Sequence, residues 1–133
     1  MVGRGTVMRR DMELVRNLLL TIEHQSEGEA IYDLQLSGYD KKAIAYHCKL
    51  LYEAGLICDY DDQYADNQLW SFGVGALTWV GHDYVEKIRS ETVWNKTKAL
   101  IGEKGLPLVI DTVRDVATAV VTGMVQGAIS GLK

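Results

Sequence analysis

One stretch decides the fold of this chain, Lys41-Lys42-Ala43-Ile44-Ala45-Tyr46-His47-Cys48-Lys49-Leu50-Leu51-Tyr52-Glu53-Ala54-Gly55-Leu56-Ile57. Its apolar residues Ile44, Cys48 and Leu51 recur at the spacing of one helix face, which predicts an amphipathic helix. Asp40 precedes the helix and can accept the free amide hydrogens of its first turn. Gly55 can adopt the left-handed backbone that ends a helix. We therefore expect one helix with a sharp stop, followed by the first residues of a strand.

The opposite side of this helix is polar and carries several lysines. In a helix that enters the major groove of DNA, lysines neutralise phosphates, and Tyr46 and His47 are placed to reach base edges. The candidate DNA-contacting residues are Lys41, Lys42, Ala43, Tyr46, His47 and Lys49. The alternative is a solvated helix face, or one that contacts a protein partner.

The pattern Tyr-His-x-Lys-Leu-Leu-x-Glu-Ala-Gly-Leu-Ile, over 46–57, resembles the recognition helix of winged-helix DNA-binding domains. Over most of 8–111 the chain also resembles DUF2513, a small bacterial and phage family whose domain has no known function. The motifs that carry this resemblance are Arg9-Arg10-Asp11-Met12, Leu50 to Ile57, Leu77-Thr78-Trp79, Gly81-His82-Asp83 and Thr92-Val93-Trp94-Asn95-Lys96-Thr97-Lys98. The resemblance implies a fold and leaves the activity open. Members of this family begin near Met8, so 1–7 is expected to be a flexible N-terminal extension.

The remaining pattern completes an α+β fold, a winged helix followed by C-terminal helices. Helical spacing predicts further helices over 11–24, 80–90, 93–103 and 108–132. Thr78 can cap the helix over 80–90. Alternation over 30–36 predicts a short strand, and a short helix over 29–36 is the alternative. Candidate wing strands are 57–60 and 70–79, with a polar loop over 61–67 between them. We expect a winged-helix-like domain over 8–90 and a C-terminal helical extension over 91–133.

The composition limits the class of protein. A chain of 133 residues can bury a core by itself. Its net charge of −4 weakens DNA binding without excluding it, because a local basic face is what phosphates require. Its cysteines, Cys48 and Cys58, come without a secretory signal, which fits a reducing cytoplasm. No uninterrupted apolar run reaches the roughly 18 residues of a membrane span.

The proposed wing argues against DNA binding. Its carboxylates, Asp59, Asp61, Asp62 and Asp66, are clustered, and no Lys or Arg occurs from Leu50 to Val85. Phosphates repel such a surface. This feature favours the alternative function, a protein-protein interaction module (an adaptor or inhibitor) without DNA affinity. The same carboxylates lack the glycine and distal glutamate of a calcium loop.

The sequence has no arrangement typical of an enzyme or a cofactor site. No Ser/His/Asp or Cys/His set and no glycine-rich phosphate loop is present. No pair among His24, His47, His82, Cys48 and Cys58 has a known metal-ligand spacing. We therefore expect a protein that is not an enzyme, with no cofactor and no metal. Cys48 is interpreted as a small core residue.

The last predicted helix, within 108–132, is apolar. It has a stripe of Val109, Val113, Val116, Val120 and Met124, and no charge occurs between Asp115 and Lys133. It is a candidate homodimer element, whose two-fold symmetry would match a palindromic DNA site. The alternative is packing against its own domain. Membrane contact is disfavoured because the helix lacks a Lys/Arg face and bulky aromatics. The leading hypothesis is a small cytoplasmic, phage-derived DNA-binding transcriptional regulator, with double-stranded DNA as its partner.

Overall fold

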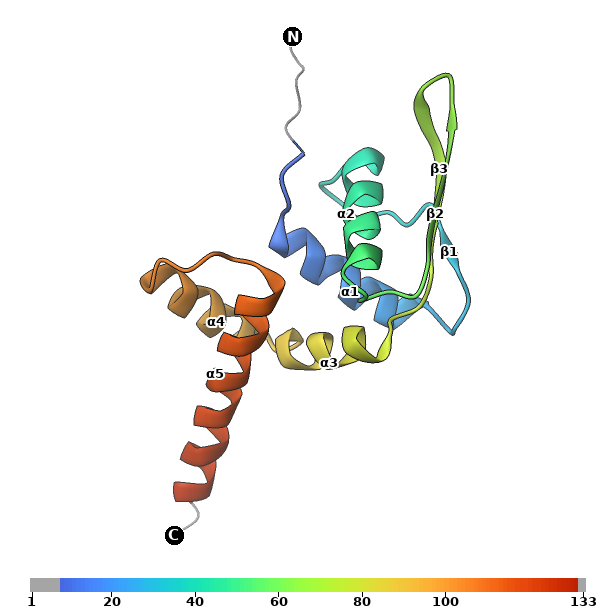
Figure 1. The fold of residues 1–133 in the computed structure, drawn as a ribbon. Helices are drawn as coiled ribbons and strands as arrows, with labels where there is room; N and C mark the ends of the chain where they lie inside the picture. The colour runs from blue at the N-terminus through green and yellow to red at the C-terminus, as the bar shows by residue number, and fades with distance from the viewer. Residues whose placement is uncertain (1–7, 132–133) are drawn as a thin grey trace. The chain divides into compact units, whose positions relative to one another are not determined.

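The computed structural model describes residues 8–131, and these form helices and one three-stranded antiparallel sheet (Figure 1). The elements in chain order are α1 (Met12–Gln25), β1 (Ile31–Tyr32), α2 (Lys41–Glu53), β2 (Tyr60–Ala65), β3 (Gln68–Val74), α3 (Trp79–Ile88), α4 (Glu91–Glu103) and α5 (Ile110–Ser130). The predicted α+β class is confirmed. The predicted extension over 1–7 and the end of the last helix at 132 lie outside the described residues.

The chain divides into two compact units, one ending at Gly81 and the other beginning at His82. The first unit contains α1, α2 and the sheet. Helices α1 and α2 pack against each other, and α2 also contacts β2 and β3. The fully buried residues of this unit come mainly from α1, α2 and the chain around β3, and include Leu14, Leu18, Leu19, Ile22, Ile44, Cys48, Leu51, Leu56, Ile57, Phe72 and Val74.

Helix α2 has the limits that its sequence predicts. The Asp40 carboxylate accepts the Ala43 amide hydrogen at 2.7 Å, which satisfies a free donor of the first turn. At the other end Gly55 has a φ of 76°, a conformation that costs glycine little. The Leu56 amide then donates to the Leu51 carbonyl at 2.9 Å, which closes the helix end. The predicted helix and its stop are confirmed.

The first strand is shorter than predicted. Alternation predicts a strand over 30–36, but only Ile31 and Tyr32 pair with β3, and no helix forms over 29–36. The reason is Asp33, whose φ of 52° turns the chain away from the sheet. The Asp33 amide still donates to the Phe72 carbonyl at 2.8 Å, but the Asp33 carboxylate, in place of a backbone carbonyl, accepts the Phe72 amide hydrogen at 3.0 Å.

The β2–β3 hairpin corrects the prediction of a loop over 61–67. Most of this segment belongs to β2, which pairs with β3 from Tyr60–Val74 to Ala65–Gln68. The turn consists of Asp66 and Asn67, with φ values of 53° and 63°. Two left-handed residues fit a tight hairpin turn, and Asp and Asn tolerate that conformation better than most residues. This segment can be rich in carboxylates and still form a strand because most of its residues are exposed to solvent.

Strand β3, the second of the two predicted wing strands, ends at Val74 and not at 79 as predicted. Beyond it, Leu77 forms an isolated bridge with Ile57, so 57 lies beside the chain before α3 and not in β2. Thr78 then caps α3 as predicted, because its hydroxyl accepts the Gly81 amide hydrogen at 3.0 Å. The same hydroxyl donates to the Gly55 carbonyl and joins the end of α2 to the start of α3.

The second unit contains most of α3, together with α4 and α5. Ser90 caps α4, and its hydroxyl accepts the Val93 amide hydrogen at 3.3 Å. Helices α4 and α5 pack against each other. Within α5 the buried residues are Val113 and Ala117, so its first half is covered and the rest is largely exposed. Among residues 8–131, no helix combines the length and the hydrophobicity needed to cross a membrane.

The close approach of α3 to the end of α2 predicts that Gly81 tolerates no side chain. A Cβ at Gly81 would lie 2.1 Å from the Leu56 carbonyl oxygen. We expect Gly81→Ala to lower the free energy of unfolding by about 1–3 kcal/mol, as overpacking does, measured by urea denaturation. The matched control is Gly102→Ala in α4, where a Cβ meets nothing within 4 Å. That variant should be neutral or slightly stabilising, and equal effects at both sites would contradict the prediction.

Candidate nucleic-acid interface

The exposed side of α2 is a stripe of polar and aromatic side chains. Lys42, Tyr46, Lys49 and Glu53 recur at helical spacing and are all exposed. Tyr46 is 38% exposed, so part of this residue is accessible to solvent and the rest is covered. Of the six predicted contact residues, Lys42, Tyr46 and Lys49 therefore lie where a ligand can reach them. The half-buried Ala43 lies at the margin of this stripe.

His47 does not belong to the exposed stripe, which corrects the prediction that it reaches base edges. It is only 2% exposed. Its Nε2 accepts the Asp11 amide hydrogen at 2.8 Å, and its Nδ1 lies 2.9 Å from the Ala43 carbonyl oxygen. Because Nε2 acts as an acceptor, Nδ1 carries the hydrogen and donates to that carbonyl. Both ring nitrogens are used inside the protein, so His47 joins the start of α1 to α2.

Lys41 is also engaged within the protein. Its ammonium lies 3.3 Å from the Asp33 carboxylate and donates a hydrogen bond to the Trp70 carbonyl oxygen. The Phe72 amide, then Lys41 and Ser71, bond to the Asp33 carboxylate and hold its pKa below the usual value, against the opposing effect of desolvation. Lys41 therefore fastens the start of α2 to β3. This role competes with phosphate contact.

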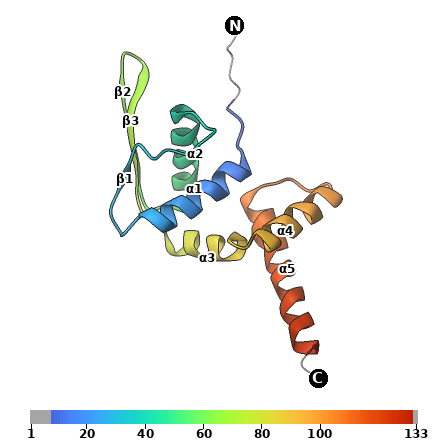
Figure 2. The same cartoon turned by 180° about the vertical axis from the view of Figure 1, so that it is seen from behind.

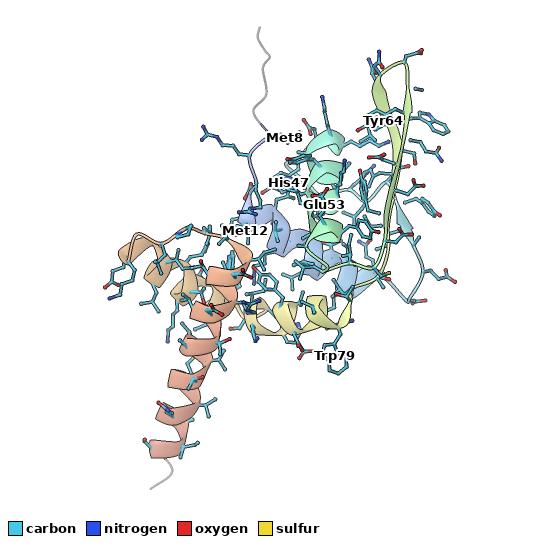
Figure 3. All side chains as sticks on the ribbon, viewed as in Figure 1. Met8, Met12, His47, Glu53, Tyr64 and Trp79 are labelled. Atoms are coloured by element: carbon cyan, nitrogen blue, oxygen red, sulfur yellow. The ribbon has the colours of Figure 1, made fainter. Side chains whose placement is uncertain are left out.

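Two arginines that the sequence-based set omits lie beside α2. Arg9 and Arg10 are both exposed and directly precede Asp11. Because the Asp11 amide is bonded to His47, this segment runs next to the middle of α2, as Figure 3 shows for the labelled Met8 and His47. A signal for them was present in the sequence, since an Arg-Arg pair precedes the α1 cap. Its proximity to α2 depends on a contact between residues 36 positions apart.

We call Arg9, Arg10, Lys42, Tyr46 and Lys49 the basic face. It holds four cations and one aromatic side chain, and all five residues are exposed. Guanidinium and ammonium groups donate to phosphate oxygens, and a tyrosine adds a hydrogen-bonding hydroxyl. The arrangement is chemically suited to a polyanion. Glu53, at the far end of the stripe, marks the limit of this face.

The hairpin presents the opposite charge. Asp61 and Asp66 are exposed, and Asp62 is half-buried, where it accepts the Tyr60 hydroxyl hydrogen at 2.9 Å. Burial, followed by this contact with Asp62, raises the pKa of Tyr60. The Tyr60 ring stacks on Phe72. Within β2, Tyr60 and Asp62 are thus half-buried and the other residues are exposed.

The two cysteines and the histidines form no metal site in the part of the chain that the structure describes. Cys48 is fully buried in α2, and burial raises the pKa of its thiol to about 12. A thiol with so high a pKa is a poor nucleophile and ligand. Its interpretation as a core residue is confirmed.

Comparison with known proteins gives a family without an assigned activity. The sequence profile of a family described as "Hypothetical protein (DUF2513)" matches residues 9–107. An uncharacterised protein of Haemophilus influenzae is 40% identical over 119 residues, which cover 88% of this chain and 98% of that protein. No solved structure matches the chain significantly. The match covers the basic face, the hairpin and α4.

The role of Asp33 in the sheet predicts a difference between two substitutions. Asn keeps an acceptor for the Phe72 amide and tolerates a positive φ, whereas Ala does neither. We expect Asp33→Ala to lower the urea midpoint more than Asp33→Asn does. If both variants unfold at the wild-type midpoint, the carboxylate does not hold the sheet.

The same pair also tests the pH dependence. Because the folded-state pKa of Asp33 is lowered from 3.8, its contribution is present above that pH and is lost as the pH falls through the folded-state pKa. The stability difference between wild type and Asp33→Asn should therefore shrink below pH 3.8. A difference that stays constant there would contradict this assignment.

Proposed function

This chain belongs to the DUF2513 family, and we propose that it is a small DNA-binding regulator whose first unit is a winged-helix domain. The strand order β1-β3-β2, with a hairpin directly after an exposed helix, supports this proposal. One element differs from an ordinary helix-turn-helix. Where its first helix would stand, residues 33–40 form an irregular turn that Asp33 and Lys41 anchor to β3.

The basic face is the observation that carries the proposal. Lys42 and Lys49 lie two helical turns apart on α2, and the exposed Arg9 and Arg10 directly precede Asp11, whose amide is bonded to His47 of the same helix. Contacts of this kind fix a helix on the phosphate backbone, and Tyr46 lies between them for contact with the groove. The set is thus revised from the sequence-based one, with Lys41, Ala43 and His47 removed and the two arginines added.

The acidic hairpin determines how such a domain would bind. A hairpin tip that carries Asp66 is repelled by phosphates. DNA contact would therefore be made by α2 and the segment before α1, with the hairpin directed away from the duplex. The net charge of −4 makes this binding sensitive to salt and to orientation.

Dimerisation through α5 is the second part of the proposal. The outer half of this helix exposes Met124, Val125 and Ile129, with 43%, 51% and 61% of each side chain accessible. Between Asp115 and the end of the described helix it carries no charge. A second copy of the same helix would bury these side chains, and a two-fold dimer would present two basic faces to a palindromic site.

A protein-interaction module without DNA affinity is the competing function, and the acidic hairpin favours it. In that case the basic face would be an ordinary solvated surface. A measurement of DNA binding distinguishes directly between the two proposed functions.

The DNA proposal predicts salt-dependent binding that needs the basic face. Fluorescence anisotropy with a labelled random duplex at low and moderate salt should show binding that weakens steeply as salt rises. Lys42→Glu/Lys49→Glu should abolish it or reduce the salt slope by about 2, because each phosphate contact contributes about 1. The control is Lys96→Glu/Lys104→Glu, the same charge change at an exposed position of α4 and at its exposed C-cap. If the wild-type protein does not bind duplex DNA at low salt, this function is excluded. If both variants lose the same amount of DNA binding, the basic face is not the DNA-binding surface.

The dimer proposal predicts a change of mass on disrupting the apolar end of α5. Sedimentation velocity should show a dimer for the wild type and a monomer for Val125→Glu/Ile129→Glu, with an unchanged circular-dichroism spectrum. The matched control is Gln126→Glu/Ser130→Glu, which places the same charges at exposed polar positions of α5. A monomeric wild type would contradict the proposal, and so would loss of the dimer in both variants.

A further inference from the structure

The sheet of the first unit ends in β1 on one side and in β2 on the other, and β2 is the longer of these two edge strands. In the order β1-β3-β2, strand β2 is terminal, so the outward backbone groups of Tyr60–Ala65 face no strand in the described structure. The opposite edge is closed differently. Beyond the short β1, the Asp33 carboxylate takes the Phe72 amide and Lys41 takes the Trp70 carbonyl. Unpaired strand edges bind extended chains, and natural proteins usually block them. The edge of β3 beyond β1 is therefore occupied by side chains, whereas no strand lies beside β2 in the described structure.

The tip of the hairpin that carries the open edge extends beyond the rest of its unit (Figure 1 and Figure 2). Both views show the β2–β3 hairpin extending beyond α2, with its tip clear of the helices of that unit (Figure 1 and Figure 2). Aromatic side chains on this sheet are unusually exposed, since Tyr64, Trp70 and Tyr32 are 62%, 67% and 71% accessible. These residues come one from each strand, and exposed aromatic side chains on one sheet are typical of a binding surface.

The sheet face beside this edge is not flat but carries a groove. The Tyr32 ring lies over Gly73, where a Cβ would come within 2.9 Å of the ring. Beside it is a shallow groove of about 200 Å³, whose lining includes Asp61, Gln63 and Ser71. The groove therefore crosses the sheet face from Tyr32 of β1 to Asp61 and Gln63 of the open strand β2.

The charge of the hairpin identifies the partner. Asp59, Asp61 and Asp66 are exposed, and no Lys or Arg occurs from Leu50 to Val85 to neutralise them. Carboxylates pair with ammonium and guanidinium groups, and exposed aromatic rings add cation–π contacts with the same groups. An acidic or neutral strand would gain the backbone bonds but none of these contacts.

We propose that the open β2 edge binds an extended, lysine- or arginine-rich segment of a partner protein, which adds as a fourth strand. Backbone bonds to β2 would supply affinity, and alternate basic side chains would lie against Asp61 and the Tyr32 groove. The six residues of β2 span about 20 Å, enough for one short strand. This interaction is independent of DNA binding, because it uses the surface that phosphates repel.

The test uses the whole chain and a labelled peptide of alternating lysine and valine. Fluorescence anisotropy should show binding that weakens with salt. A peptide with the same side chains but N-methylated at alternate residues cannot donate along a strand edge, and it should not bind. If the N-methylated peptide binds equally well, the attraction is only electrostatic and the strand-addition proposal is wrong.

Protein variants locate the site. Asp61→Asn/Asp66→Asn removes two exposed charges, and Asn keeps the left-handed turn at 66. Binding should weaken about threefold or more, since exposed ion pairs each contribute modestly. The matched control, Asp111→Asn/Asp115→Asn on α5, should bind as wild type, and so should Lys42→Glu/Lys49→Glu, which tests DNA binding separately. Equal weakening in the α5 control would overturn the proposal. A self-associated species lost only in Asp61→Asn/Asp66→Asn would also overturn it, because a second copy would then occupy the edge.

Discussion

The arrangement of the first unit depends on Asp33, whose carboxylate accepts a hydrogen bond from β3 at the point where β1 ends. Asp33 leaves the sheet in a left-handed conformation, and its carboxylate then returns to hold the Phe72 amide, the Ser71 hydroxyl and the Lys41 ammonium. These contacts end β1, close one edge of β3 and fix the start of α2. A longer β1 would have continued along β3 and displaced Lys41 from the Trp70 carbonyl. The position of α2 against the hairpin therefore follows from the left-handed backbone conformation of Asp33 and from the contacts of its carboxylate.

A second set of contacts fixes the other end of α2. Gly55 ends the helix, the Thr78 hydroxyl bonds to its carbonyl, and Gly81 lies against the Leu56 carbonyl. The hairpin thus begins and ends at one junction, and α2 is held at both ends. A rigid helix with one free side is a suitable support for recognition, because its side chains need no large rearrangement before they bind.

The first unit separates its charges between two surfaces. Cations occur on the segment before α1 and along α2, whereas carboxylates occur on the hairpin. Opposite surfaces of this kind suit a protein that holds an anionic partner on one side and a cationic partner on the other. The proposed DNA contact and the proposed strand addition use different elements and different charges, so each can fail without the other. A regulator that links DNA to a basic protein segment would need both.

The sequence by itself determined the elements whose signals are local. Helix α2, its Asp40 cap and its Gly55 stop could be predicted because a capping side chain and a left-handed glycine act within a few residues. The α+β class, the Thr78 cap and the burial of Cys48 followed in the same way. The family was recognisable from motifs distributed along the chain, and the profile match over 9–107 confirms it.

Only the tertiary structure decided the features that depend on distant residues. The length of β1 depends on Asp33 meeting β3, 39 residues further along the chain. The burial of His47 depends on the Asp11 amide, and the same bond brings Arg9 and Arg10 beside α2. The carboxylates of β2 have the composition of a loop and became a strand because β3 supplied a partner. Periodicity reports which side chains share a face, but which face another element covers depends on contacts that no local pattern contains.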